Sequence, residues 1–232
     1  MSGLQVVGVT GGGSAVVAFD LGHGDDPRIE LAHRGWVVVG PWAATLEAAG
    51  DLRLEVGVAP WTGTAPEPRP PVPTDDGLVI TDGEIAAVHQ RVGSYAVVVH
   101  DGALLLTQLA DHVAGVGGRW SLPGGGIDPG ESPLEGVVRE VWEETGQHVE
   151  DVRLVDLRSN HWVGRSPAGR LEDFHAVKLF HVARCPAPTD LVVHDVGGST
   201  SRAAWVPLER VGEVPLAGSV AEHLDDWLAA VR

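Results

Sequence analysis

The chain has 232 residues, of which 44% are hydrophobic and 21% charged, and this balance argues against a disordered chain or a coiled coil. Its 32 acidic and 16 basic residues give a formal charge of −16, which repels the phosphates of DNA and RNA. We therefore expect no nucleic-acid polymer as a partner. The length favours one full domain with a smaller companion.

The first part of the chain, residues 1–61, is predicted to form a small β-rich domain. Short runs rich in β-branched residues and bounded by glycine clusters predict strands at 4–9, 14–20, 35–39 and 51–58. Residues 42–49 are compatible with a helix. Because a unit of about 60 residues has a marginal core of its own, we expect it to pack on a second domain or another subunit, and we predict a homodimer.

Residues 62–77 hold five prolines and no sustained apolar pattern, which predicts an extended, semi-rigid linker. The linker separates the N-terminal domain from a second domain over residues 78–232. In that second domain, residues 85–92 are either helical or extended. Asp101 and Gly102 form the expected turn of a hairpin whose strands are 95–100 and 103–107.

The remaining elements of the second domain mix strands with helices, which predicts an α/β or α+β architecture. The expected strands are 152–157, 174–182 and 202–206, and the expected helices are 133–145 and 217–231. The single cysteine, Cys185, excludes an internal disulfide and suits a reducing compartment. No stretch approaches the roughly 18 apolar residues of a membrane span, and no signal peptide is visible at the N-terminus. We expect a cytoplasmic protein without a membrane partner.

The helix expected at 133–145 has clear start and stop signals. Ser132 and Glu135 form a capping box around Pro133, and Gly146 ends the helix. One face is predicted to be apolar and the opposite face polar. The apolar face would carry Leu134, Val137, Val138, Val141, Trp142 and Thr145, and the polar face Glu135, Gly136, Arg139, Glu140, Glu143 and Glu144.

The acids on the polar face predict a cation site. Glu140, Glu143 and Glu144 are neighbours on the helix, and each like-charge pair opposes helix formation by about 0.2–0.5 kcal/mol. They also crowd the negative end of the helix dipole. Arg139 can reach Glu143, so we expect two carboxylates without a local partner. Converging carboxylates are ligands that Mg²⁺ or Mn²⁺ prefers, so one of these cations is the expected cofactor.

A glycine-rich loop, Trp120-Ser-Leu-Pro-Gly124-Gly125-Gly126, precedes this helix and allows backbone to approach a ligand closely. The whole pattern resembles the MutT-like Nudix box of the Nudix hydrolase family. It runs from Gly125 through five residues to Glu131, then through seven residues to Arg139-Glu140, Glu143-Glu144 and Gly146. Gln147 departs from the pattern, which has an aliphatic residue at that position.

The resemblance implies a Nudix α/β/α sandwich with a mixed sheet over residues of about 85 to 232. It also implies metal-dependent hydrolysis of a nucleoside diphosphate linked to another group, such as a nucleotide or nucleotide sugar. By resemblance, Glu140, Glu143 and Glu144 are metal ligands and Glu131 is an accessory ligand. Arg139 would orient a glutamate, and the loop Gly124, Gly125 and Gly126 would lie beside the phosphates.

The general base and the substrate contacts lie outside the box. Asp195 and then His194 are the favoured bases, ahead of Asp190 or a box glutamate. Arg119 and Trp162 are the principal expected substrate contacts. Further base-stacking or phosphate-binding candidates are Trp120, Phe174, Arg158, Arg165 and Arg170. The alternative to hydrolysis is a Nudix-fold nucleotide sensor with vestigial catalysis. The sequence does not identify the nucleotide.

Overall fold

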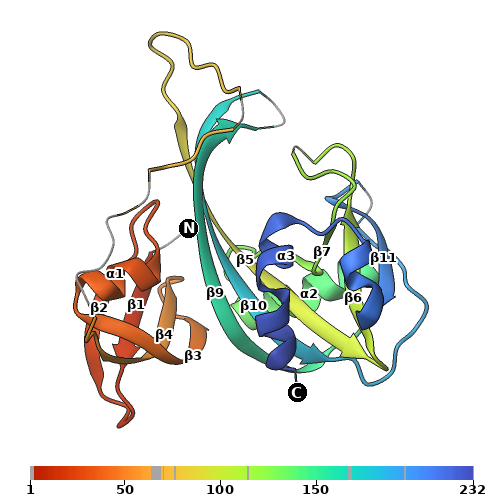
Figure 1. Cartoon of the computed structure of the whole chain (residues 1–232), viewed down its shortest axis with the longest axis horizontal. Helices are drawn as coiled ribbons and strands as arrows, with labels where there is room; N and C mark the ends of the chain where they lie inside the picture. The colour runs from red at the N-terminus through yellow and green to blue at the C-terminus, as the bar shows by residue number, and fades with distance from the viewer. Residues whose placement is uncertain are drawn as a thin grey trace. The chain divides into compact units, whose positions relative to one another are not determined.

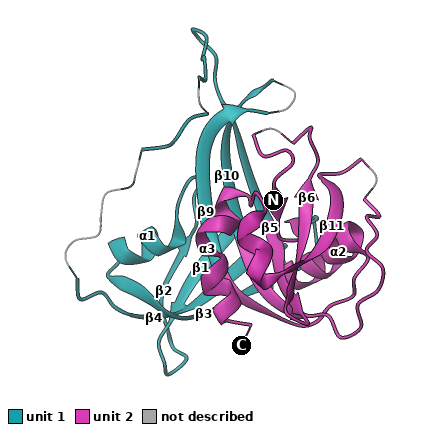
Figure 2. Cartoon of the chain, turned by 45° about the vertical axis from the view of Figure 1, so that its right-hand side comes forward, with its two compact units in different colours: residues 1–92, 128–132, 157–178 teal, residues 93–127, 133–156, 179–232 magenta. Residues whose placement is uncertain are grey.

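The computed structural model describes residues 3–63, 69, 71–75, 77–113, 115–166, 169–195 and 197–231. The chain forms two compact units, shown in different colours in Figure 2. The first comprises residues 1–92, 128–132 and 157–178, and the second comprises 93–127, 133–156 and 179–232. The chain passes between the units within strands β5 (Ala87–His100), β9 (Glu150–Arg165) and β10 (Leu171–Arg184). The domain boundaries predicted from the sequence stay predictions.

A four-stranded sheet forms near the N-terminus, in the order β2-β1-β4-β3 (Figure 1). Its strands are β1 (Leu4–Val9), β2 (Ala15–Asp20), β3 (Trp36–Leu46) and β4 (Leu52–Pro60). Along β4 every second side chain is buried, as expected for a sheet with one face in a core. The predicted β-rich character of the N-terminal region is confirmed.

Two local predictions for this region are corrected by the structure. The helix considered at residues 42–49 is wrong, because Trp42 to Leu46 pair with β4 as part of β3. A helix that the strand pattern did not predict, α1 (Pro27–His33), follows β2. Its start is specified locally: the Asp26 carboxylate accepts hydrogen bonds from the backbone N–H of Arg28 at 2.7 Å and of Ile29 at 3.2 Å.

The predicted linker, residues 62–77, lies partly outside the described residues, at 64–68, 70 and 76. Its described part makes specific contacts within the first unit. Thr74 forms an isolated parallel bridge with Val163, and the Asp75 carboxylate accepts a hydrogen bond from the backbone N–H of Arg165 at 3.0 Å. These contacts fix the end of the segment on β9.

The second sheet has seven strands, with β11-β6-β5-β10-β9 as its main order. The short strands β7 (Trp120–Ser121) and β8 (Gly124–Gly126) pair with β6 (Ala103–Leu109) and β5. The predicted hairpin is confirmed: Asp101 and Gly102 join β5 to β6 with positive φ angles of 46° and 74°. The strands predicted at 152–157, 174–182 and 202–206 are confirmed within β9, β10 and β11 (Thr200–Pro207).

Two helices of the second unit pack on opposite faces of this sheet. Helix α2 (Pro133–Thr145) packs on the side chains of Ala96, Val98 and Leu105. Helix α3 (Gly218–Ala229), which follows the 3₁₀ helix η1 (Leu208–Glu213), packs on the alternate positions Val97, Leu104 and Leu106. Because neighbouring strand residues face opposite sides, each strand contributes to both cores. The predicted α/β/α sandwich and its two helices are confirmed.

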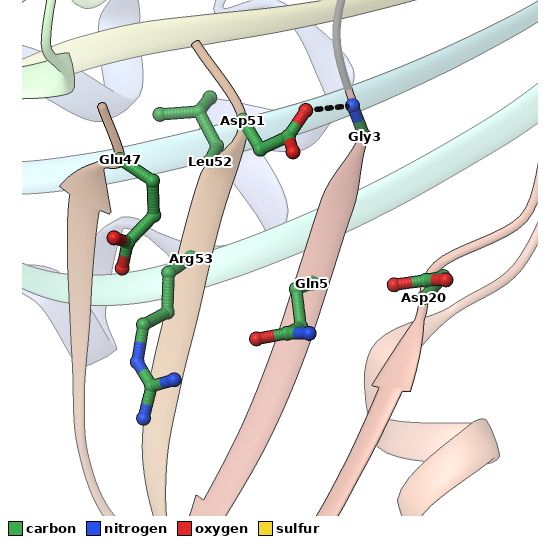
Figure 3. Close-up of a pocket in the computed structure, with 7 residues that line it drawn as sticks. All are labelled: Gly3, Gln5, Asp20, Glu47, Asp51, Leu52 and Arg53. Atoms are coloured by element: carbon green, nitrogen blue, oxygen red, sulfur yellow. Dashed lines mark hydrogen bonds between the residues drawn. The ribbon is translucent and has the colours of Figure 1, made fainter. Parts of the chain in front are cut away.

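A polar pocket on the N-terminal sheet is shown in Figure 3. Its lining residues are Gly3, Gln5, Asp20, Glu47, Asp51, Leu52 and Arg53. The Asp51 carboxylate accepts a hydrogen bond from the backbone N–H of Gly3 at 2.6 Å, and Arg53 forms an ion pair with Glu55. Acids outnumber the arginine in this pocket, so it disfavours the phosphates of a nucleotide.

None of the helices in the described part of the chain combines the length and the apolar character that a membrane span needs.

Candidate active site

The glycine-rich loop lies directly against β5. Strand β8 pairs antiparallel with it, with Gly124 opposite Tyr95 and Gly125 opposite Ser94. Gly124 has a φ of 145°, and a Cβ there would lie 2.3 Å from the carbonyl oxygen of Ser94. Only glycine fits this position. Trp120, a predicted base-stacking residue, is buried in the core that also contains α3, so this role is wrong.

Glu144 is the buried carboxylate of the site, with 3% of its surface exposed. One oxygen accepts a hydrogen bond from the backbone N–H of Gly124 at 2.9 Å, and the other accepts one from the Thr200 hydroxyl at 2.5 Å. Burial raises the pKa of Glu144 to about 7; these two hydrogen bonds oppose the shift, whereas the nearby carboxylates of Glu140 and Asp195 add to it. The acid is therefore held rigidly in surroundings that disfavour its charge.

Arg139 organises the other two glutamates of the helix. One guanidinium nitrogen, Nη1, lies 2.9 Å from Glu143 Oε2 and 3.1 Å from Glu140 Oε1. The second nitrogen, Nη2, donates to the carbonyl oxygen of Gly126 at 2.9 Å. The expectation of two carboxylates without a local partner is wrong, because the planar fork of Arg139 contacts both acids and the loop together. Glu144 has the partners described above.

The buried face of α2 differs from the predicted apolar face. Leu134 and Trp142 are 51% and 41% exposed, whereas Gly136 and Glu144 are buried. The reason is tertiary: α2 contacts β8 and β11, and these strands cover its glutamate side. The prediction is confirmed for Val137, Val141 and Thr145, which are buried, and wrong for the two exposed residues and for Glu144.

The segment after β10 covers the C-terminal end of α2. Backbone N–H groups of His194 and Asp195 donate to the carbonyl oxygen of Glu143 at 2.6 and 3.1 Å. Such carbonyls at a helix end lack partners within the helix, so these bonds fix the loop in place. The His194 ring stacks on the exposed Trp142 with 4.3 Å between ring centroids. Of the two predicted bases, Asp195 is the one whose negative charge helps to raise the pKa of Glu144.

Gln147, the departure from the family pattern, is buried beneath the same loop. Its amide oxygen accepts a hydrogen bond from the backbone N–H of Thr189 at 2.9 Å. Its amide nitrogen donates to the carbonyl oxygens of Thr189 at 3.2 Å and Asp190 at 3.5 Å. An aliphatic residue could make none of these bonds, so glutamine here ties the loop that carries Asp195 to the end of α2.

The other predicted site residues have other partners. Arg119 is exposed in the second unit, where it donates to the carbonyl oxygen of Leu216 at 3.2 Å. Six predicted residues, Glu131, Arg158, Trp162, Phe174, Arg165 and Arg170, belong to the first unit. There the Glu131 carboxylate accepts from the backbone N–H of Asp128, Trp162 packs on Phe174, and Arg165 and Arg170 form ion pairs with Glu84 and Glu172. The positive charges of Arg165 and Arg170 are therefore partly neutralised by these glutamates.

Thr200 is a site residue that the sequence reasoning missed. It lies 56 positions after Glu144, and its hydroxyl is buried against that carboxylate. No local pattern marks it, since it contacts the helix only because β11 and α2 meet in the fold.

The oxygen donors gathered here fit a hard divalent cation. Glu140, Glu143 and Glu144 offer carboxylate oxygens, which Mg²⁺ and Mn²⁺ prefer to nitrogen or sulfur. Burial and the neighbouring carboxylates disfavour the charged form of Glu144 and raise its pKa, and a cation bound beside it would favour that form.

Comparison with known proteins gives consistent matches. A family model described as NUDIX domain matches residues 89–229. A MutT-like protein of Streptomyces ambofaciens is 47% identical over 64 residues, which cover 28% of this chain and 38% of that protein. Nucleoside triphosphatase NudI of Salmonella schwarzengrund is 31% identical over 127 residues, which cover 53% of this chain and 86% of NudI.

A solved structure with a similar arrangement is that of a MutT NUDIX hydrolase from Burkholderia pseudomallei. It has a TM-score of 0.46 and 28% identity, and the match covers 59% of this chain and 97% of that chain.

Proposed function

We propose, since this chain belongs to the NUDIX family, that it hydrolyses a phosphoric anhydride linkage in a nucleotide with the help of a divalent cation. The prediction of a Nudix hydrolase from residues 125–147 is confirmed by the family match over 89–229. The observation that best supports the reaction is the position of Glu144. It is a buried acid beside Glu140 and Asp195, and both its oxygens are held.

Glu140, Glu143 and Glu144 would hold the cation. When bound, Mg²⁺ or Mn²⁺ would supply neutralisation of phosphate charge and a lower pKa for water. Arg139 keeps Glu140 and Glu143 together and fixes them to the loop through Gly126. Asp195, on the loop bound to the end of α2, would accept the proton of the attacking water.

The substrate class is a nucleoside diphosphate bearing a further group. A nucleoside triphosphate belongs to this class, and the name of the relative NudI, nucleoside triphosphatase, supports triphosphates as the first candidates. Nucleotide sugars come next. A Nudix-fold sensor with vestigial catalysis is the second candidate, and tight nucleotide binding without turnover would favour it.

The direct test is release of phosphate or pyrophosphate from a panel of nucleotides by the full chain, with Mg²⁺, with Mn²⁺ and with EDTA. We expect cation-dependent turnover that Glu143→Gln lowers about 100-fold or more. Glu135→Gln is the matched control, since Glu135 is an exposed acid in the first turn of the same helix. Equal loss in both variants would argue that helix charge in general, rather than the site, sets the rate.

The general base is tested by Asp195→Asn and His194→Ala in pH-rate profiles at saturating cation. We expect Asp195→Asn to lower turnover about 100-fold and to alter the acidic limb, as for loss of a general base. We expect His194→Ala to have a smaller effect, because its ring stacks on Trp142. Near-normal profiles for both variants would assign proton transfer to a box glutamate or to bound hydroxide.

The predicted homodimer stays a prediction, as does a cytoplasmic location. One feature that supports association is a run of exposed apolar side chains, Val79, Ile80, Ile85 and Val88. Light scattering of the full chain is expected to give twice the monomer mass, and Ile85→Glu is expected to shift the mass toward that of a monomer. A monomeric wild type would contradict this prediction.

A further inference from the structure

Three side chains that the proposed reaction does not use meet within the first unit. His23 follows β2, His161 lies on β9 and Asp173 lies on β10. The Nε2 atoms of both histidines approach the same carboxylate oxygen of Asp173, His23 at 3.0 Å and His161 at 2.5 Å. The three donor atoms all lie within 4.8 Å of one another. A single ion of ordinary coordination radius can contact all three.

The group is partly buried and partly exposed to solvent. Side-chain exposure is 22% for His23, 20% for His161 and 28% for Asp173. This burial limits competition from bulk water, while the remaining exposure gives an ion a way in. His175, fully buried, packs edge-on against both imidazoles.

The loop that carries His23 is fixed by several independent contacts. The Asp25 carboxylate accepts a hydrogen bond from the backbone N–H of Gly22 at 3.0 Å and pairs with Arg69 at 3.0 Å. The backbone carbonyl of Asp25 accepts a hydrogen bond from the Ser159 hydroxyl at 3.0 Å, which attaches the loop to β9. The donors are therefore preorganised by their surroundings, as a metal site requires.

Gly24 completes this arrangement. It has a φ of 77°, and a Cβ there would lie 2.5 Å from Nδ1 of His161. The loop backbone consequently lies against the imidazole of His161 and restricts its orientation.

The two histidines direct the same ring atom, Nε2, at one oxygen of Asp173, so the three donor atoms converge. Two imidazole nitrogens and one carboxylate oxygen form a familiar ligand set for a transition-metal ion.

We propose that His23, His161 and Asp173 form a binding site for a divalent transition-metal ion of the Zn²⁺ type. Imidazole nitrogen suits Zn²⁺ and Co²⁺ and is a poor ligand for Mg²⁺, so this site differs in chemistry from the all-oxygen set around Glu144. Three protein ligands leave a fourth position for water or an incoming ligand. The ion would join the loop after β2 to β9 and β10 and so stabilise the folded chain.

The test uses the metal-free full chain in excess Mg²⁺, which occupies oxygen-only sites, and Co²⁺ and Zn²⁺ as probes. We expect one equivalent of Co²⁺ to give the visible absorption of a tetrahedral site and one equivalent of Zn²⁺ to displace it. His161→Gln and Asp173→Asn should each weaken binding about 100-fold or more. Zn²⁺ should raise the melting temperature of the wild type but not of these variants.

His89→Gln is the matched control, because His89 also lies on a strand of the first unit and pairs with a carboxylate, Glu172, at 3.7 Å. It should bind Co²⁺ and Zn²⁺ like the wild type. Circular dichroism checks folding, and His23→Gln, a change in a loop, replaces any strand variant that fails to fold. Absence of stoichiometric binding by the wild type, or binding by His23→Gln and His161→Gln that is as tight as in the wild type, would overturn the proposal. Glu143→Gln should keep this site, so its outcome is independent of the proposed hydrolysis.

Discussion

Replacing Glu144 with glutamine is expected to lower turnover about 100-fold or more and, at the same time, to make the metal-free protein more stable at pH 8. Both effects have the same origin. Glu144 is a buried acid whose negative charge is useful for holding a cation and unfavourable without one. Glutamine has nearly the same shape and can still accept the hydrogen bond from Gly124.

The direction of the pH effect follows from the raised pKa of Glu144, about 7 against an ordinary value of 4.5. The folded state binds the proton more tightly than the unfolded state does. The resulting stability is fully present below about pH 4.5 and is lost as the pH rises through about 7. A difference of this size corresponds to roughly 3 kcal/mol of unfolding free energy.

Urea unfolding in EDTA at a series of pH values between 4.5 and 8 measures this loss. Relative to Glu144→Gln, the wild type and the Glu135→Gln control should lose stability over the interval. The comparison with the variant is needed because burial lowers the pKa of His175 and of His181 to about 4, and these groups add stability with rising pH in all three proteins alike. Adding Mg²⁺ should restore stability to the wild type at pH 8 and leave Glu144→Gln nearly unchanged. A variant that unfolds early, with unchanged activity per folded molecule, would show instead that Glu144 is structural.

Local signals in the sequence were sufficient for most of the second sheet and its helices. Asp101-Gly102 specifies its hairpin through positive φ angles that these residues tolerate. The capping box at Ser132 and the glycine at 146 predicted the observed bounds of α2, Pro133–Thr145. These features depend on neighbours in the chain, so they can be recognised without the fold.

The predictions that failed concern segments whose structure depends on residues far away in the sequence. Residues 42–46 form a strand because β4 is available to pair with them, whatever their own preference. Helix α1 is the exception, since Asp26 followed by Pro27 is a start signal that lies within the local sequence.

The same distinction between local signals and distant partners applies to the candidate site. The spacing of Arg139, Glu140, Glu143 and Glu144 marks the helix and its acids. This spacing cannot show that Glu144 is buried. The residue that covers Glu144 is Thr200, which lies on β11, far from the helix in the sequence. The group of His23, His161 and Asp173 is hidden for the same reason: its members are up to 150 residues apart.

Gly124→Ala is expected to be the most damaging small change in the loop, with a loss of about 3 kcal/mol of unfolding free energy. The added methyl would lie 2.3 Å from the carbonyl oxygen of Ser94 and 2.6 Å from Cα of Tyr95, and both are backbone atoms of β5. Relief of this clash requires β8 to move away from the sheet. That movement would also withdraw the Gly124 N–H from Glu144, so activity should fall as well.

Gly102→Ala separates this clash from the general cost of a positive φ angle. Gly102 has a φ of 74°, but no atom lies within 4 Å of a Cβ placed there. Its substitution should therefore cost only about 1–2 kcal/mol and leave turnover per folded molecule unchanged. The measurements are urea unfolding of both variants and cation-dependent turnover at a temperature where each is folded. Equal stability and activity in the two variants would show that β8 can move away from β5 at little energetic cost. It would also show that Glu144 does not depend on the Gly124 backbone for its position.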